Sequence, residues 1–496
     1  MNFIKPEDRY QIGIFNSLDD TISRDNPIRI INLVVDSIVD NNREKLIKEK
    51  PSEVGPPSYH PAAMLKLYLY GYFNRISSSR RLETETYRNN ELIWLLGNLH
   101  PDHWTISNFR KCNGNEIKFV TKKFREFLVG EGYIKLEKVG IDGSKIKANA
   151  KRDMLSIKKI NKRLERMDEK IEEYLNRLSK NDISEDIIEE LEDKEGEVDI
   201  NQELLDKIIK LRKEVEELRN HKQLMEELGC KYYSETDPES NLMKSRDGKV
   251  PAYNVQIVVD ETNRMIVDSE VSQESNDVRQ LSAMIDSLKE EVGKIPKEAY
   301  ADKGYYNPDM IEEVEREHGI EVYVSIPETK KSEENIIFTY DKEKDEYECS
   351  GGKRLKLEQR NKKKRSSYAN MYRGEHCSEC ELKSGCTKSI KGRTIHRYHN
   401  QGLRDSYVKK ILSVEVQEKM KIRKTLVEHP FGTIRCLMGK IPLLLRGVFK
   451  VSIEINLYTT VYNLKRLINV ERIDNLIKRI QTYSWRTVGQ IKYEPT

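Results

Sequence analysis

The feature that most constrains the fold is an ordered series of strand and helix patterns between Tyr133 and Ser325, interrupted once by a long charged segment. Alternating apolar residues at 134–141 predict a strand that ends at Asp142-Gly143. After the charged segment, a predicted hairpin at 253–271 precedes a helix at about 277–292, a strand at 298–301, a second helix at 308–318 and a second strand at 321–325. Without the interruption, this order is that of a mixed sheet covered by helices, so the sequence predicts an α/β core.

The charged segment, residues 157–228, carries apolar residues at three- and four-residue steps among many Glu and Lys. This spacing predicts two long amphipathic helices, broken near 181–184 and again near Gly196. A charged helical hairpin is the expected form, and its charges are interpreted as a solvated face without chemistry. The N-terminal residues 61–127 also indicate helices, which fits either a DNA-binding domain or an ordinary helical bundle.

Towards the C-terminus, residues 405–438 predict a long helix that contains Pro430, and residues 452–468 predict a last helix. A proline inside a helix removes a hydrogen bond, so a kink or a new start is expected just after residue 428. The predicted organisation is an N-terminal helical DNA-binding domain (1–130), a core (131–154 and 229–327), a helical-hairpin insert (155–228), a cysteine-bearing insertion domain (328–400) and C-terminal helices of the core (401–496).

Composition narrows the class of protein. A hydrophobic fraction of 37% is too high for general disorder, and no apolar run is long enough to span a bilayer. The N-terminus lacks the basic-then-apolar order of a secretory signal, so a cytoplasmic protein is expected. The net charge of +4 says little about a nucleic-acid partner. Its distribution says more, because basic residues gather at 353–373 and 409–424.

Three acidic residues, far apart in the sequence, occupy positions that suit a catalytic site. Asp142 and Asp302 each follow a predicted strand, and ligands collect at such strand ends in α/β sheets. Glu428 lies on the long C-terminal helix beside an apolar stripe formed by Val427, Phe431, Ile434 and Met438. Three converging carboxylates repel one another unless cations neutralise them, and hard oxygen ligands suit Mg²⁺ or Mn²⁺. Two such ions, about 4 Å apart, promote in-line phosphoryl transfer.

A single aspartate at a strand end is more often a turn residue or a helix cap than a catalytic group. The surrounding residues distinguish these three. Val139-Gly-Ile-Asp142-Gly-Ser-Lys, Tyr300-Ala-Asp302-Lys-Gly-Tyr305 and Val427-Glu428-His-Pro-Phe-Gly-Thr-Ile-Arg435 resemble, in this order, the three acidic motifs of bacterial insertion-sequence transposases of the DDE class. His103-Trp-Thr-Ile-Ser-Asn-Phe-Arg110 and Tyr462-Asn-Leu-Lys-Arg466 also resemble this family, so that the similarity covers most of the chain.

The resemblance implies a ribonuclease-H-like mixed-sheet core, an N-terminal DNA-binding domain and transposition of a mobile element. It places the metal-binding carboxylates at Asp142, Asp302 and Glu428, with two Mg²⁺ or Mn²⁺ ions as cofactors. Lys424, or its neighbour Arg423, then takes the place of the arginine that many relatives carry before the glutamate, and Arg435 that of the later lysine, as phosphate contacts. The implied partners are the double-stranded terminal inverted repeats and target DNA, bound by a homodimer associated with the bacterial nucleoid.

Seven cysteines without an export signal favour metal binding or free thiols over disulfides. Cys377 and Cys380 form a C-x-x-C pair between Cys349 and Cys386, which predicts a structural Cys₄ zinc site in the insertion domain. His376 or His396 could replace one ligand, and a degenerate site with free cysteines is the alternative. In relatives, insertion domains at this position help to grip DNA, and the basic run 362–365 fits either that use or a solvated linker.

Two other functions remain open on the sequence alone. A metal-dependent DNA nuclease would use the same carboxylates for cleavage without strand transfer. A catalytically silent, transposase-derived DNA-binding protein would keep the fold without the reaction, although the presence of all three carboxylates argues against it. The predicted function is a DNA transposase that cleaves and rejoins element ends.

Overall fold

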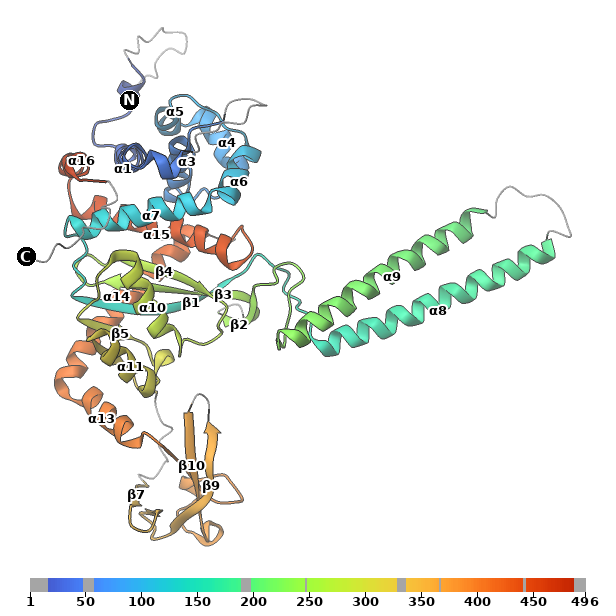
Figure 1. Ribbon diagram of the computed structural model, residues 1–496, viewed down its shortest axis with the longest axis vertical. Coiled ribbons are helices and arrows are strands. Elements are labelled where there is room, and N and C mark those ends of the chain that lie inside the picture. The colour runs from blue at the N-terminus through green and yellow to red at the C-terminus, as the bar shows by residue number, and fades with distance from the viewer. Residues whose placement is uncertain are drawn as a thin grey trace, which may run out of the picture. The chain divides into compact units, whose positions relative to one another are not determined.

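The computed structural model (Figure 1) describes residues 17–47, 58–188, 198–245, 248–327, 336–364, 367–439 and 443–485. Contacts among the residues divide the chain into two compact units. The first consists of Met1–Lys135, Gly143–Asn276 and His429–Thr496, and the second of Leu136–Asp142 and Asp277–Glu428. Among the described helices, none combines the length and the apolar character that crossing a bilayer requires.

Helices dominate the first unit, and those predicted within 61–127 are confirmed. The N-terminal helices are η1 (Leu18–Thr21), α1 (Ile28–Asn41), α2 (Arg43–Leu46), α3 (Pro61–Phe73), α4 (Ser79–Arg88), α5 (Asn90–Leu96), α6 (His103–Cys112) and α7 (Gly114–Gly130). They pack with α15 (Val448–Val470), which contains the predicted helix 452–468, and with α16 (Ile473–Thr482). The long helix α15 is buried over most of its length and contacts both α3 and α7.

A buried ion pair joins α6 to α15. Glu454 is fully buried, and its carboxylate lies 3.7 Å from Nη1 of Arg110. The same carboxylate accepts hydrogen bonds from the backbone N–H groups of Leu444 and Leu445, at 2.9 and 2.8 Å. Burial raises the pKa of Glu454, although these partners oppose the shift. Removing one member of such a pair leaves an uncompensated buried charge, so the pair fixes α6 on α15.

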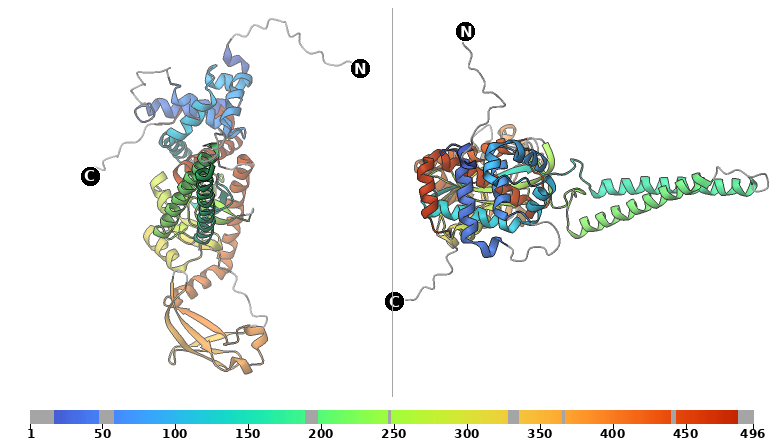
Figure 2. Two further views of the ribbon diagram at one scale, coloured as in Figure 1. Left: turned by 90° about the vertical axis from the view of Figure 1, so that its right-hand side faces the viewer. Right: turned by 90° about the horizontal axis from the view of Figure 1, so that it is seen from above.

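The charged insert forms α8 (Ile157–Ile188) and α9 (Val198–Glu227), two long helices that lie side by side (Figures 1 and 2). Ile160, Leu218 and Met225 are buried between them near their base. The predicted break near 181–184 is wrong, because α8 continues through it. Asn, Asp and Ser cost a helix only about 0.5 kcal/mol each relative to alanine, which a helix of 32 residues absorbs. The predicted break at Gly196 lies outside the described residues.

The larger sheet contains β1 (Lys138–Lys147), β2 (Asn241–Ser245), β3 (Gly248–Asp260), β4 (Ile266–Ser272), β5 (Glu298–Ala301) and β6 (Glu321–Val324). The strand order is β2-β3-β1-β5-β6, and β4 pairs with β3. The mixed sheet and the β3–β4 hairpin are confirmed, whereas β2 was not predicted. β1 pairs with β5, and β5 with β6, in parallel. β1 does not end at Asp142 as predicted but continues to Lys147.

Helices of the second unit include α10 (Gln280–Val292), η2 (Lys303–Tyr305), α11 (Pro308–His318) and α13 (Gln401–Leu412), and α14 (Val414–Met438) belongs to it as far as Glu428. The predicted bounds of α11 are confirmed. The predicted long helix 405–438 is in fact two helices that meet at Ser413. The new helix start considered after residue 428 is wrong, since α14 runs on through Pro430, whereas the kink stays a prediction. The neighbouring Val427 and Phe431 are buried, and this packing outweighs the hydrogen bond that the proline removes.

The cysteine-bearing segment forms its own antiparallel sheet of five strands, which the sequence patterns did not predict. Its order is β11-β10-β9-β8-β7, and β9 and β10 form a hairpin (Figure 1). The strands are β7 (Phe338–Asp341), β8 (Glu346–Cys349), β9 (Arg354–Lys364), β10 (Ser367–Gly374) and β11 (Thr394–Tyr398). Two short helices, η3 (Cys377–Glu379) and α12 (Lys383–Cys386), connect β10 to β11. Tyr347, Leu355 and Tyr372 form its small core.

Candidate functional site

Asp142 and Asp302 occupy equivalent positions on two neighbouring parallel strands. In the register of β1 and β5, Ile141 pairs with Ala301, so the next residue on each strand is one of the two aspartates. Asp302 keeps an extended backbone (φ −79°, ψ 166°) and therefore continues the direction of β5. Neighbouring strands lie about 4.8 Å apart, and residues paired across parallel strands present their side chains to the same face. The fold thus brings these two predicted site residues together.

The helix that carries Glu428 lies on the same face of β1 as Asp142. A Cβ atom at Gly140 would lie 2.6 Å from Cγ1 of Val427 and 3.1 Å from Cβ of Leu426, so α14 approaches the backbone of β1 closely there. Side chains alternate along a strand, and Asp142 therefore shares the face of Gly140, two residues earlier. Val427 and Leu426 are almost completely buried in this contact. Only a residue without a side chain allows this approach.

Two basic residues of α14 attach the helix to β5 on this face. Lys419 Nζ donates to Oε1 of Glu298 and to the hydroxyl of Tyr323, each at 3.2 Å. One turn later, Nη1 of Arg423 lies 3.8 Å from Oδ1 of Asp302. The bonds to Tyr323 and Glu298 raise the pKa of Lys419 above its usual range. Burial alone would raise the pKa of Glu298, but hydrogen bonds from Tyr300 and Lys419 outweigh burial and lower it.

The remaining predicted site residues on α14 are placed in part. Nη2 of Arg435 donates to the hydroxyl of Ser144, two residues after Asp142 on β1. The backbone positions of Lys424 and Glu428 on α14 are described, but their side chains lie outside the described residues. Asp302, 43% of whose side chain is exposed, accepts a hydrogen bond from the backbone N–H of Lys303 at 2.7 Å, in the manner of a helix cap.

This arrangement offers hard oxygen ligands on two neighbouring strands with the guanidinium group of Arg423 nearby. Two carboxylates in this arrangement suit Mg²⁺ or Mn²⁺ and do not suit soft metals. Within the described ranges, no three His, Cys, Asp or Glu side chains are gathered as ligands of one ion. Since the Glu428 side chain is not among them, the described part of the site contains two of its three predicted carboxylates.

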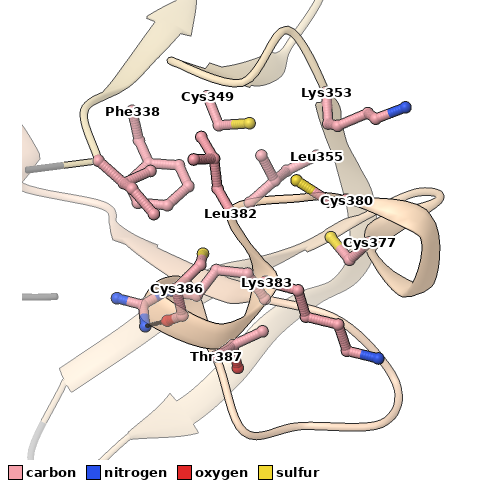
Figure 3. Close-up of a pocket in the computed structure, with 12 residues that line it drawn as sticks. Phe338, Cys349, Lys353, Leu355, Cys377, Cys380, Leu382, Lys383, Cys386 and Thr387 are labelled. Atoms are coloured by element: carbon pink, nitrogen blue, oxygen red, sulfur yellow. Dashed lines mark hydrogen bonds between the residues drawn. The ribbon is translucent and has the colours of Figure 1, made fainter. Parts of the chain in front are cut away.

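The four cysteines of the insertion domain line one pocket (Figure 3). Cys349 ends β8, Cys377 and Cys380 flank η3, and Cys386 ends α12. A Cβ at Gly351 would lie 3.7 and 3.8 Å from the sulfurs of Cys349 and Cys380. Neither His376 nor His396 is among the residues that line the pocket. The thiols therefore share a cavity without being gathered into a coordination sphere.

The pKa of Cys386 reflects this crowding. Burial raises the pKa of its thiol most, Arg393 lowers it, and the other three cysteines raise it further. A thiol whose charged form is disfavoured in this way must lose its proton before it can serve as a metal ligand. The other cysteines lie elsewhere in the sequence, and Cys112 and Cys436 are exposed.

Sequence reasoning missed three residues that shape the site: Gly140, Ser144 and Lys419. Ser144 and Gly140 each lie two residues from Asp142, on the same face of the strand, which was a usable signal once the strand was known to continue past Asp142. Lys419 lies four residues before Arg423, on the same helical face. The close approach at Gly140 is a tertiary contact that no local pattern specifies.

Comparisons with known proteins point in one direction. Residues 16–112 match the family described as transposase domain (DUF772), and residues 348–468 match the family described as transposase DDE domain. The second match includes Glu428, whereas Asp142 and Asp302 lie outside both. No curated protein matches the chain significantly. A cryo-EM structure of the piggyBac transposase synaptic complex with hairpin DNA covers 94% of this chain and 86% of its own, at 10% identity. Its TM-score of 0.22 is too low to support an argument.

Proposed function

We propose that the chain, which matches transposase families in two segments, is a DDE-class insertion-sequence transposase that cleaves the ends of a mobile DNA element and joins them to target DNA. The observation that carries this proposal is the pairing of β1 with β5, which sets Asp142 beside Asp302 under the helix of Glu428. The strand order β4-β3-β1-β5-β6, with β1, β5 and β6 parallel, supports a ribonuclease-H-like core.

Asp142, Asp302 and Glu428 would hold two Mg²⁺ or Mn²⁺ ions. The fit rests on the donor set, since carboxylate oxygens from two neighbouring strands are ligands that these hard cations prefer. When bound, the ions supply activation of the attacking oxygen and stabilisation of the leaving oxygen in an in-line displacement.

The chain's own residues position the DNA. Arg423, which lies against Asp302, would contact phosphates together with Lys424, and Arg435, which bonds to Ser144, would be a further phosphate contact. In the first step, water attacks the phosphodiester at the element end, and the 3′ oxygen leaves with a proton. In the second, that 3′-hydroxyl attacks a target phosphodiester, so one P–O bond forms as another breaks. Two ends must be handled together, so a homodimer is the proposed working form.

Strand transfer distinguishes this function from its alternatives. The test uses the full chain, a labelled duplex of the element end that adjoins its gene, and supercoiled target plasmid in Mg²⁺. Labelled end joined to plasmid is the expected product. Cleaved end without joining would favour a nuclease instead. Intact duplex that nevertheless binds would favour a silent DNA-binding protein, and both of these outcomes contradict the proposal.

A structural zinc ion is the second ligand that we propose, held by Cys349, Cys377, Cys380 and Cys386. Its support is the common pocket of four thiols in a sheet whose core is small (Figure 3). Small domains of this kind commonly depend on a metal for stability. A bound zinc ion would draw the thiols together as thiolates, at sulfur distances of about 2.3 Å.

The expected result is about one zinc per chain in protein purified without chelator. Cys380→Ser is expected to lose that zinc and to lower the melting temperature of the insertion domain, because a serine hydroxyl does not replace a thiolate ligand. Metal content by mass spectrometry and thermal unfolding with and without chelator measure both effects. Cys112→Ser, at an exposed cysteine, is the matched control and should change neither. Zinc-free wild-type protein would refute the site.

A further inference from the structure

Helix α6 presents one face to its neighbours and the opposite face to solvent. Ile106 and Arg110 are buried, and the ring of Phe109 stacks with that of Tyr68 at 6.3 Å between centroids. The hydroxyl of Tyr68 donates to the carbonyl of Ile106, and Arg110 Nη1 donates to the hydroxyl of Tyr72 at 3.0 Å. These contacts fix the rotation of α6 about its own axis.

The opposite face of α6 is a row of exposed residues at helical spacing: His103, Trp104, Ser107, Asn108 and Lys111. Steps of three and four residues place them along one side of the helix. Trp104 is 70% exposed, which is unusual for so large an apolar side chain. Around it stand a hydroxyl, an amide and an ammonium group. A rigid helix therefore displays donors and acceptors to solvent, although His103 also contacts Glu83 and the amide oxygen of Asn108 also accepts a hydrogen bond from the thiol of Cys112.

The preceding segment fits a helix-turn-helix. Helix α4 contacts both α5 and α6, and the turn 97–102 connects α5 to α6. His100 in that turn stacks on Tyr87 of α4, with 4.2 Å between ring centroids. Glu83 of α4 lies 2.8 Å from Nδ1 of His103 at the start of α6. Asp102 caps the helix by accepting from the backbone N–H of Thr105 at 2.8 Å. The exposed Arg80 and Tyr87 lie on the α4 face that carries Glu83.

We propose that α6 is the recognition helix of this chain and that Trp104, Ser107, Asn108 and Lys111 read base edges in the major groove of double-stranded DNA. The major groove is wide enough to admit one α-helix. An asparagine pairs with adenine, a lysine with guanine, and an apolar side chain contacts the thymine methyl group. Arg80 on α4, which packs against α6, then contacts a flanking phosphate.

The exposed face favours DNA over a protein partner. The core of a protein interface is depleted in lysine and in small polar residues, whereas this row contains one aromatic residue among polar ones. This inference deepens the proposed function, since it assigns the residues that would choose the element end. It concerns binding only and makes no use of the carboxylates.

The test begins with duplexes that the full-length wild-type chain selects from a random-sequence library in EDTA, where metal-dependent cleavage cannot occur. Asn108→Ala and Lys111→Ala are each expected to weaken binding of the selected duplex by about 5- to 100-fold. Binding of a shuffled duplex of the same composition should change by no more than about twofold for Asn108→Ala. Relative to the wild type, each variant should lose methylation interference at a single base pair of the selected duplex.

Asn115→Ala and Lys135→Ala are the matched controls, because both residues are exposed and lie outside α6. They should bind the selected duplex as the wild type does. Unchanged binding by both α6 variants, or equal losses on selected and shuffled duplexes, would overturn the inference. The inference would also be overturned if the α6 variants kept wild-type DNA binding but lost binding to a protein partner. If α6 variants lose selective binding while wild-type chain shows no strand transfer, the inference holds and the proposed enzymatic function fails.

Discussion

Replacing Asp142 or Asp302 with asparagine is expected to reduce metal-dependent cleavage of the element end by about a thousandfold or more. Asparagine keeps the shape of the side chain but removes the charge that neutralises a divalent cation. The two residues are paired across neighbouring strands, so the loss of either carboxylate leaves the other to hold the ions with Glu428. A loss of several kcal/mol of charge stabilisation corresponds to this factor. The measurement is the cleavage rate of an end-labelled duplex in Mg²⁺.

A matched substitution separates the loss of a metal ligand from the effect that replacing any exposed aspartate with asparagine would have on the protein. Asp286 lies on α10, is 56% exposed, and contacts Nε2 of His318 at 3.1 Å. Asp286→Asn should cleave at a rate close to that of the wild type. All three variants should still bind DNA in EDTA, because the substitutions remove no positively charged side chain that contacts phosphates. Cleavage by both Asp142→Asn and Asp302→Asn at more than about a tenth of the wild-type rate would contradict the assignment.

Gly140→Ala is expected to cost the fold about 1–3 kcal/mol and to lower cleavage by about a hundredfold. The added Cβ would meet Val427 Cγ1 at 2.6 Å and Leu426 Cβ at 3.1 Å, so α14 must move away from β1. That helix carries Arg423 and Glu428, and a displacement of about 1 Å at a reacting centre is costly. Chemical denaturation measures the first effect and the cleavage assay the second.

Two further variants test whether the contact itself is responsible. Val427→Ala removes the methyl group that the new Cβ would strike, so Gly140→Ala combined with Val427→Ala should recover part of the lost activity. Gly432→Ala is the control on the same helix, because a Cβ at Gly432 meets nothing within 4 Å. It should be neutral or slightly stabilising. If Gly140→Ala lowered cleavage equally with and without Val427→Ala, the close contact of α14 with β1 at Gly140 would not be what positions the helix.

The sequence predicted the elements with strong local signals and failed where tertiary packing decides. Strand β5 and helix α11 have their predicted bounds, since alternation and capping residues fix them locally. A new helix does not start after residue 428, because buried neighbours of Pro430 hold α14 together. The sheet of the insertion domain was missed because its strands are rich in Lys, Glu and Arg, which obscure an alternating pattern.

The candidate site likewise contains features that local sequence patterns predicted and features that depend on tertiary packing. Asp302 was predictable because it follows a strand, and Asp142 because the strand was expected to end there, although β1 in fact continues past it. The register of β1 with β5 places the two aspartates together. The apolar stripe on α14 is confirmed, as Val427, Phe431, Ile434 and Met438 are all buried. What the sequence did not indicate was how α14 reaches the sheet. Gly140 and the contacts of Lys419 and Arg423 on β5 determine that approach, and they join residues more than a hundred positions apart.

The central claim, that Asp142, Asp302 and Glu428 together hold divalent cations, is tested most directly by Mn²⁺ binding. Electron paramagnetic resonance of the full chain bound to its element-end duplex counts the Mn²⁺ ions that are immobilised. The wild type is expected to bind Mn²⁺ in this complex, and Asp142→Asn, Asp302→Asn and Glu428→Gln are each expected to bind less. Undiminished Mn²⁺ binding by all three variants would contradict the account.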